Sequence, residues 1–327
     1  KSLCSWCRGS MPLISFKDSS RAWIKKALLN REERIVLRSS TRSFDNDNVI
    51  QSVLLEDPEI FFVDSYKTTK TGRTVIIEPH YTFPYSDIIS LSSQCRDIAS
   101  RLVSRTLQEN DTYEKVRIVH DLLAKNVVYS GESPLMDHSI VGPLIKKRAV
   151  CDGFSRAFKY LLDQIHIPCV VVTGKAINAI NGSWESHAWN LVNMNGKWTH
   201  VDVTYDTTVR VGNVLRYDYF GLPDSWIKVD HKPSETDLPE AGSEEFEYYR
   251  RNGLYVGNKS SLRMLTRMCI NNKQRRIVVR LPMTTTINGL EKQVLCALQE
   301  IRDDTNTNLQ YTLYFNSFQR VFHIELF

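Results

Sequence analysis

The 327-residue sequence predicts an α+β protein. Amphipathic helical patterns lie over 111–127 and from Cys151 to about residue 165. They are followed by a strand-like run and by two alternating runs joined at Asn195-Gly196, which is a strong hairpin signal.

Composition and charge exclude several classes of protein. The chain is 42% hydrophobic and 10% aromatic, enough for one large core or two to three modest ones. The net charge of +5 comes from 42 basic and 37 acidic residues spread along the chain, so we expect no nucleic-acid partner. No apolar stretch reaches about 18 residues, so we expect no transmembrane span. The oligomeric state is not predicted.

Changes in pattern divide the chain into five segments. They are a flexible arm over 1–20, an N-terminal α+β region over 21–108, a core over 109–231, a linker over 232–257 and a small C-terminal α+β unit over 258–327. The linker is predicted from the turn-forming and charged residues in "KPSETDLPEAGSEEFEYYRRNG". Beyond it, "RRIVVRLPM", "INGLEKQVLCALQEIRDDT", "LQYTLYF" and "RVFHIELF" predict a β-α-β-β unit, with the last strand covered on one face. We expect this unit to recognise a partner or to stabilise the core.

The N-terminal region begins with a helix. Its apolar residues recur at helical spacing after Ser19 or Ser20 as the N-cap, and a short strand follows near 35–37. The stretches "EIFFVDSY" and "RTVIIEPHYTF" predict strands because they are rich in β-branched and aromatic residues. A helix is expected over 86–108.

The core opens with a helix capped by Asp111 or Thr112. One stripe of this helix carries apolar side chains, namely those of Val116, Val119, Leu122, Leu123 and Val127. His120 lies beside the stripe, where a packed, hydrogen-bonded histidine is more typical than a catalytic one. The next stretch, "GESPLMDHSIVGPLIKKRAV", has the residues of a loop and leads into the second helix.

Cys151 lies in the first turn of that second helix, in "AVCDGFSRAFKYLLD". The buried stripe is formed by Phe154, Ala157, Phe158, Leu161, Leu162 and Ile165, and Cys151 continues it. A cysteine on an apolar stripe can simply pack. The first turn, however, also has free backbone N–H groups and the positive end of the helix dipole, which stabilise a thiolate and an oxyanion. Position alone leaves both interpretations open.

The hairpin supplies groups that could activate the thiol. With Asn195-Gly196 as a two-residue turn, Asp202 faces Trp189 and His187 faces Thr204. His187 and Asp202 are then diagonal neighbours on one face, within reach of each other. Cys151, His187 and Asp202 would supply a nucleophile, a base and a group that orients the base. His200, on the same face, is the alternative base.

These motifs resemble the transglutaminase-like superfamily, whose papain-related fold packs an N-terminal catalytic helix on an antiparallel sheet and carries a Cys-His-Asp triad. The matching stretches are "AVCDGFSRAFKYLLDQIHIPCVVVTGKA", "SHAWNLV" and "GKWTHVDVTYD", within a similarity over about 110–230. The resemblance implies Cys151 as nucleophile, His187 as general base and acid, and Asp202 as the residue that orients it. It therefore favours His187 over His200.

The resemblance also implies an activity and its setting. Members attack a Gln or peptide carbonyl and form an acyl-thioester, so the expected partner is a protein or peptide substrate. The sequence is most similar to bacterial members, which is compatible with an extracytoplasmic or cell-envelope location. The chain begins with Lys and has no signal-peptide segment, so we expect a processed or truncated form. No acidic loop has calcium-ligand spacing, and we expect no metal and no cofactor.

One departure from the family pattern supports a second interpretation. Other members place an aromatic or amide side chain upstream of the cysteine as an oxyanion donor, whereas "SIVGPLIKKRAVC" has no Gln, Trp or Tyr. An inactive binding or scaffold protein with the same cleft is therefore the alternative to an enzyme. Trp184, Trp189 and Trp198 could line a groove, although packing is more typical of such residues.

The seven cysteines do not form a disulfide scaffold. Their number is odd and their spacing is wide, so at least one thiol is free. Cys4 and Cys7 in "CSWC" have the spacing of half a zinc site, but no second pair follows. We expect no metal site there.

Overall fold

The computed structural model describes residues 15–38, 46–208, 215–305 and 310–326. The chain divides into two compact units, Lys1–Arg96 and Asp97–Phe327. Among the described residues, no helix combines the length and the apolar character needed to cross a membrane.

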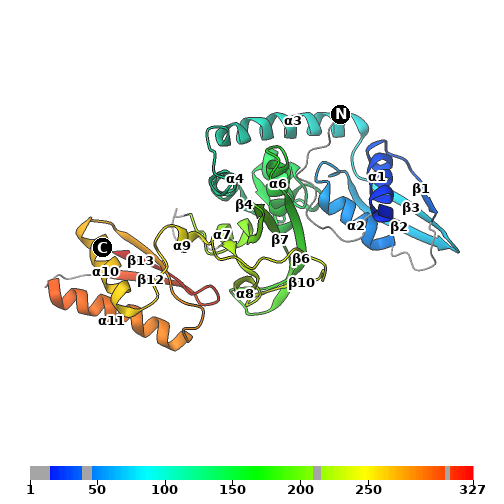
Figure 1. Ribbon diagram of the computed structural model, residues 1–327. Helices are drawn as coiled ribbons and strands as arrows, with labels where there is room; N and C mark the ends of the chain where they lie inside the picture. The colour runs from blue at the N-terminus through cyan, green and yellow to red at the C-terminus, as the bar shows by residue number, and fades with distance from the viewer. Residues whose placement is uncertain (1–14, 39–45, 209–214, 306–309, 327) are drawn as a thin grey trace. The chain divides into compact units, whose positions relative to one another are not determined.

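The first unit contains a three-stranded antiparallel sheet in the order β1-β3-β2 (Figure 1). Its elements, in chain order, are α1 (Ser15–Leu29), β1 (Ile35–Arg38), α2 (Asn46–Glu56), β2 (Val63–Thr71) and β3 (Thr74–Tyr81), and α3 (Tyr85–Val103) follows. Helices α1 and α2 contact each other. Ile24, Leu28, Val53 and Ile77 are buried in this unit.

Three predictions for this unit need correction. Helix α1 begins at Ser15, so residues 15–20 do not belong to a flexible arm, and Ser19 and Ser20 lie inside the helix rather than at its cap. Residues 1–14, with Cys4 and Cys7, lie outside the described residues. Helix α2 was not predicted, and β2 starts only at Val63, because the apolar residues before it are buried in a turn.

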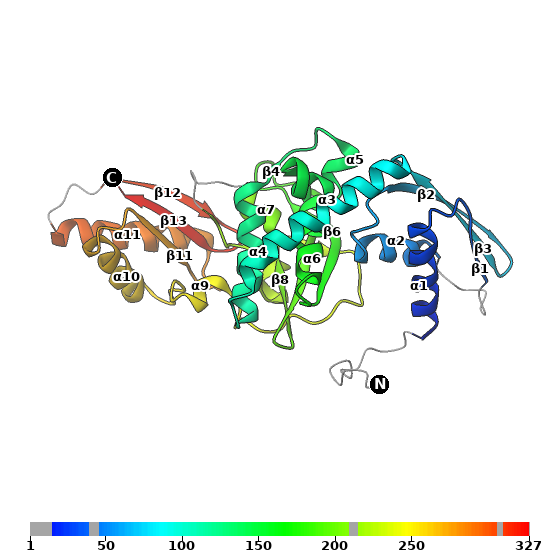
Figure 2. The same ribbon diagram turned by 90° about the horizontal axis from the view of Figure 1, so that it is seen from above.

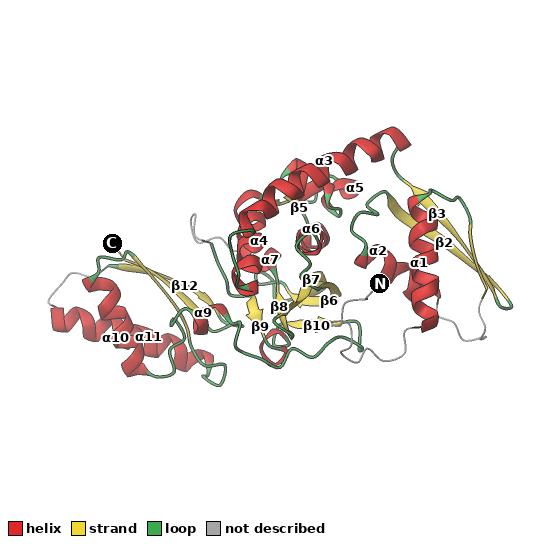
Figure 3. Cartoon of the chain, turned by 45° about the horizontal axis from the view of Figure 1, so that its top comes forward, coloured by secondary structure: helices red, strands yellow, loops and turns green. Residues whose placement is uncertain are grey.

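The second unit is built on an antiparallel sheet in the order β10-β6-β7-β8-β9. Its strands are β6 (Cys169–Ile177), β7 (Trp184–Met194), β8 (Lys197–Val201), β9 (Phe220–Leu222) and β10 (His231–Pro233). The helices around it are α4 (Thr112–Asn126), α5 (Pro134–Asp137), α6 (Cys151–Asp163), α7 (Val203–Thr208) and α8 (Asp224–Ile227). Helix α6 packs on β6 and β7 and contacts α4 and α7 (Figure 3). The predicted α+β class, with a helix on an antiparallel sheet, is confirmed.

The two predicted core helices form as their patterns require. The Asp111 carboxylate accepts a hydrogen bond from the Tyr113 N–H at 3.0 Å and caps α4. The five apolar side chains predicted for the α4 stripe are all buried. In α6, Phe154, Ala157 and Phe158 are fully buried, which fixes the helix and the Cys151 at its first position.

The hairpin register is confirmed as far as Val201. Met194 pairs with Lys197 and Asn190 with Val201, around a turn in which Asn195 and Gly196 both have positive φ. The strand then ends, because the Asp202 carboxylate accepts the Tyr205 N–H at 3.1 Å and starts helix α7. The predicted pairing of His187 with Thr204 is therefore wrong.

The segment predicted as a linker, 232–257, is packed instead. Its first residues belong to β10, which pairs with β6. Ala241, Phe246 and Tyr249 are buried. Gly221 has φ of +79°, and a Cβ there would overlap the Phe246 carbonyl oxygen, so the segment lies directly against β9. Its polar composition resembled a linker, but a few apolar anchors hold it against the sheet.

The C-terminal part of this unit contains the predicted β-α-β-β order. It comprises β11 (Arg276–Arg280), α11 (Ile287–Thr305), β12 (Tyr311–Asn316) and β13 (Val321–Leu326), preceded by α9 (Tyr248–Arg251) and by α10 (Lys259–Asn271), neither of which was predicted. The antiparallel order β11-β13-β12 makes β13 the central strand (Figure 2). Successive β13 side chains are buried, so this strand is covered on both faces rather than on one.

Candidate active site

Cys151 is held at the start of α6 by the stretch that precedes it. The Val150 N–H donates to the Asp137 carbonyl at 3.0 Å, and a Cβ at Gly153 would overlap the same oxygen. The buried Asp137 carboxylate accepts the Ser133 N–H at 2.8 Å and the Arg148 guanidinium at 3.1 Å. This stretch, predicted as a loop, contains α5, a π-helical turn over Gly142–Lys146 and the short strand β5 (Arg148–Ala149). It is therefore a packed support for the cysteine.

The structure brings His187 and Asp202 together. The His187 Nε2 lies 2.6 Å from the Asp202 Oδ2. The Asp202 side chain is 0% exposed and the His187 side chain 7% exposed. The Cys151 thiol is near enough to the same imidazole to raise its pKa. The three residues predicted from the motifs are thus neighbours, although Asp202 lies just beyond the strand that was predicted to carry it.

This arrangement favours a charged imidazole beside a charged carboxylate. Burial disfavours the His187 imidazolium, but the Asp202 carboxylate and the Cys151 thiol outweigh burial and raise the pKa of His187 to about 9. Burial would raise the pKa of Asp202, yet His187 and His231 lower it well below its ordinary value. At neutral pH, an imidazolium therefore lies between the thiol and the carboxylate.

A second histidine, His231, contacts the same carboxylate, and the sequence interpretation missed it. Its Nε2 lies 3.1 Å from the Asp202 Oδ2, and its Nδ1 lies 2.7 Å from the Asp230 Oδ1. The only signal in the sequence was the Asp-His pair in "IKVDH", at the edge of the family resemblance. Pairing of β10 with β6 brings it to the site, and local patterns do not encode that pairing.

Some of these side chains could also hold a metal ion. Ligand atoms of His187, Asp202 and His231 lie within 4.8 Å of one another. In this structure, the same atoms are hydrogen-bonded to each other. Mutual hydrogen bonding therefore already accounts for the cluster.

His200, the alternative base, is occupied elsewhere. Its Nε2 lies 2.9 Å from the Asp224 Oδ1, and its Nδ1 accepts the Trp189 indole N–H at 3.0 Å. Burial lowers the pKa of His200. In the structure, Asp202 therefore pairs with His187 and His231, and His200 pairs with Asp224.

Sequence comparison assigns a family to the region that holds these residues. The sequence model of the Transglutaminase-like superfamily matches residues 96–203, which include Cys151, His187 and Asp202. This domain belongs to the transglutaminase-like superfamily. The mouse (Mus musculus) protein Kyphoscoliosis peptidase is 27% identical to the chain over 188 residues, which is 50% of this chain. The match spans only 28% of the length of that protein.

Solved structures give more distant matches. A TGase crystal structure is 15% identical, covers 56% of this chain and 53% of its own, and has a TM-score of 0.32. The periplasmic domain of TgpA from Pseudomonas aeruginosa, bound to ethylmercury, is 15% identical over 44% of this chain and 66% of its own, with a TM-score of 0.27. The family assignment rests on the sequence match.

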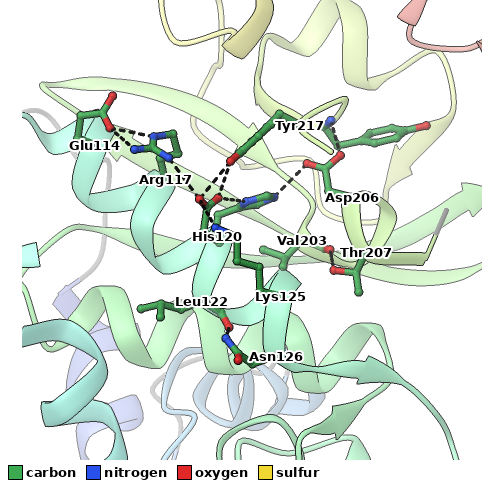
Figure 4. A network of polar contacts seen from close by, with 12 residues as sticks. Glu114, Arg117, His120, Leu122, Lys125, Asn126, Val203, Asp206, Thr207 and Tyr217 are labelled. Carbon is green, nitrogen blue, oxygen red and sulfur yellow. Dashed lines mark hydrogen bonds and ion pairs between the residues drawn. The ribbon is translucent and has the colours of Figure 1, made fainter. Parts of the chain in front are cut away.

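His120 belongs to a different polar network of the transglutaminase-like domain (Figure 4). Its Nδ1 lies 3.2 Å from Asp121 and its Nε2 lies 3.1 Å from Asp206. The Tyr217 hydroxyl donates to the Asp121 carboxylate at 2.9 Å. His120 is fully buried, so it is the packed, hydrogen-bonded histidine that its place beside the α4 stripe predicted.

Aromatic side chains surround the His187 imidazole. The Tyr205 ring centroid lies 4.6 Å from it, and the Tyr205 hydroxyl donates to the Ile177 carbonyl at 3.0 Å. Tyr129, in the short strand β4 (Val128–Tyr129), is exposed, and its phenol is near enough to Cys151 and Asp202 to interact with them electrostatically. Partial burial and the nearby Cys151, Glu185 and Asp202 groups raise the pKa of Tyr129, so its phenol stays protonated at neutral pH.

The three tryptophans predicted as groove or packing residues differ in their surroundings. Trp189 is fully buried, and Trp198 packs partly buried against the same apolar cluster. The Trp184 ring is only partly buried, and the Lys232 ammonium lies 4.0 Å from its centroid. Trp189 and Trp198 are therefore packing residues.

Proposed function

We propose that this protein is a cysteine enzyme that acts on peptide or protein amide bonds, with Cys151 as nucleophile, His187 as general base and acid, and Asp202 as the residue that orients His187. The observation that carries the proposal is the position of the His187 imidazole. It interacts with the Cys151 thiol and is held by the Asp202 carboxylate at 2.6 Å. Because Nε2 is engaged by Asp202, Nδ1 is the nitrogen that serves the thiol.

In the first half-reaction, the amide carbonyl is attacked by the Cys151 thiolate. A C–S bond forms, and the carbonyl electron pair moves to oxygen. When this intermediate collapses, the C–N bond breaks and the departing nitrogen takes the proton held on the His187 imidazolium. An acyl-thioester on Cys151 remains.

In the second half-reaction, the thioester is resolved by water or by an amine. The nucleophile gives a proton to the neutral His187 and forms a bond to the acyl carbon, and the C–S bond breaks to regenerate the thiolate. Water yields hydrolysis or deamidation, and an amine yields amide transfer. The name of the mouse relative, a peptidase, favours water.

Tyr129 is our proposal for the oxyanion donor that the loop sequence lacks. Strand β4 pairs in parallel with β5, and Tyr129 stands opposite Ala149, two residues before Cys151. The Cys151 N–H at the start of α6 is the other donor. Two donors would then face the developing oxyanion, one from the helix and one from the neighbouring strand.

The test begins with the thiol. Iodoacetamide at pH 6 should label Cys151 well before Cys296, which is a partly exposed free cysteine in α11 and serves as the matched control. His187→Ala should slow labelling of Cys151 and leave that of Cys296 unchanged. Equal labelling of the two cysteines would contradict an activated nucleophile and favour an inactive binding protein.

The reaction class follows from a peptide screen. Gln-containing peptides are incubated with and without a biotinylated monoamine, and products are identified by mass spectrometry. Loss of one ammonia with gain of water indicates deamidation, chain cleavage indicates a peptidase, and incorporation of the amine indicates transfer. Cys151→Ala is the control in each case, and product formed equally by this variant would overturn the proposal.

A further inference from the structure

Asp202 is held by more partners than a Cys-His-Asp triad needs. Its Oδ2 receives both the His187 Nε2 at 2.6 Å and the His231 Nε2 at 3.1 Å. Its Oδ1 accepts the Tyr205 N–H at 3.1 Å. Both oxygens of the buried carboxylate are therefore fixed, and one of them is shared between two imidazoles.

His231 is the next member behind Asp202. Its two ring nitrogens face two carboxylates, Asp202 on one side and Asp230 on the other. With both carboxylates ionised, each nitrogen must carry a proton, so His231 is an imidazolium. The side chain is fully buried, and this charge therefore acts on Asp202 with little screening.

Asp230 connects this histidine to the C-terminal part of the unit. Its Oδ2 accepts the Tyr219 hydroxyl at 2.7 Å, and its Oδ1 accepts the Gln319 amide at 3.2 Å. Gln319 lies in the turn between β12 and β13 and is 0% exposed. Its amide also donates to the Trp226 carbonyl at 3.3 Å. The tip of the β12–β13 hairpin is thus buried against the residues that support the candidate active site.

We propose that the C-terminal hairpin positions the catalytic carboxylate through a hydrogen-bonded line, Gln319–Asp230–His231–Asp202. The inference rests on the proposed function and names three positioning residues for it. Gln319 fixes Asp230, Asp230 fixes the His231 imidazolium, and His231 fixes Asp202 and offsets part of its negative charge.

The line has a consequence for His187. An Asp202 whose charge is partly offset by His231 stabilises the His187 imidazolium less than an isolated carboxylate would. The ionisable groups around His231 are Asp202, Asp230, His187, His200, Tyr205 and Tyr219. Among them, Asp202 and Asp230 are the two carboxylates. Loss of the His231 charge should therefore make His187 more basic.

The experiment follows the imidazole ¹⁵N resonances of the full chain as a function of pH, which requires no substrate. In the wild type, His231 should show two protonated nitrogens at pH 7. Gln319→Met removes the donated hydrogen bond but keeps the side-chain length. Because Asp230 and His231 are then held less firmly against Asp202, the His187 midpoint should rise by about half a pH unit. His231→Gln should raise it by about one unit.

His323→Gln is the matched control. His323 lies on β13 and its Nε2 is 3.4 Å from Asp218, so it joins the hairpin to a different buried carboxylate. The His187 midpoint should not move in this variant. Unchanged His187 midpoints in both Gln319→Met and His231→Gln, or a neutral His231 in the wild type, would overturn the inference.

A second variant and a labelling measurement separate failure of the inference from misfolding and from failure of the proposed function. If Gln319→Met does not fold, the inference is judged from the His187 midpoint in His231→Gln, because that variant retains the whole hairpin. Iodoacetamide labelling of Cys151 is measured on the same samples. If the His187 midpoint shifts but Cys151 is unreactive, the hydrogen-bonded line is supported and the proposed function is contradicted. If Cys151 is reactive but the His187 midpoint does not shift, the proposed function is supported and the line is contradicted.

Discussion

His120 and His187 are two buried histidines of one domain that differ in a single respect. Both have a carboxylate on Nε2, and both have a pKa raised to about 9, because ionised partners outweigh the cost of burial. On the other side, His120 meets a second carboxylate, that of Asp121, whereas His187 meets the Cys151 thiol. The charge of the two imidazoles is the same, but only His187 adjoins a thiol.

The comparison shows what a raised histidine pKa does and does not indicate. A histidine between two carboxylates serves as their counter-ion. No reacting group lies beside it to take up its proton. A histidine with one carboxylate and one thiol can exchange its proton with a reacting group. Four experiments would break or sharpen this distinction.

The largest effect is expected from His187→Ala. Without the imidazole, the thiol loses its base and the leaving nitrogen loses its acid, so kcat/KM should fall about 10³-fold or more. The measurement is turnover of the best peptide from the screen. Urea denaturation of the same variant should show a folded protein, and activity within a few-fold of the wild type would place catalysis elsewhere.

His120→Ala should act on stability instead. It leaves Asp206 with no imidazole partner in the core, so the free energy of unfolding should fall by about 3 kcal/mol. Urea denaturation at pH 7 measures it. His80→Ala is the control, because the His80 side chain is 70% exposed in its pair with Asp64 and should contribute little. Equal losses in the two variants would contradict a structural role for His120.

Tyr129→Phe tests the proposed oxyanion donor. Removal of one hydroxyl that acts only on the transition state should lower kcat about 10²-fold and leave KM nearly unchanged. Tyr85→Phe, at an exposed position of α3, is the control and should change neither constant. A rise in KM with an unchanged kcat would assign Tyr129 to substrate binding.

The smallest effect is a slope of stability with pH. In the folded protein, the pKa is about 9 for each of His120, His187 and His231, above the ordinary 6.5. The contribution of each charged imidazole to stability is therefore fully present below pH 6.5. That contribution is lost as pH rises from 6.5 through 9. Each of the three histidines should lower the free energy of unfolding by about 1.4 kcal/mol per pH unit over this window. His120→Gln should reduce the slope, and stability that rises with pH would contradict the assigned charges.

Local patterns predicted the helices of the core and the hairpin because their causes are local. The α4 stripe and the Asn195-Gly196 turn each depend on residues within a few positions of one another. The register derived from that turn placed His187 near Asp202. The predicted register failed beyond Val201. Asp202 was predicted to continue the strand, but its carboxylate caps helix α7 instead.

The parts that could not be predicted depend on contacts between distant residues. His231 reaches Asp202 only because β10 pairs with β6, more than fifty residues earlier in the chain. The stretch after it is polar and rich in turn formers, which is typical of a linker, yet Phe246 and Tyr249 anchor it in the core. Gln319 carried no signal at all, since a single buried amide has no local pattern.

The late position of β10 and Gln319 in the chain has a consequence for synthesis. A ribosome completes Cys151, His187 and Asp202 before it reaches His231, and Gln319 follows Asp202 by 117 residues (319 − 202). At roughly 10 residues per second, this interval lasts on the order of ten seconds. A nascent chain therefore holds Cys151 and His187 for that time without the groups that complete the surroundings of Asp202.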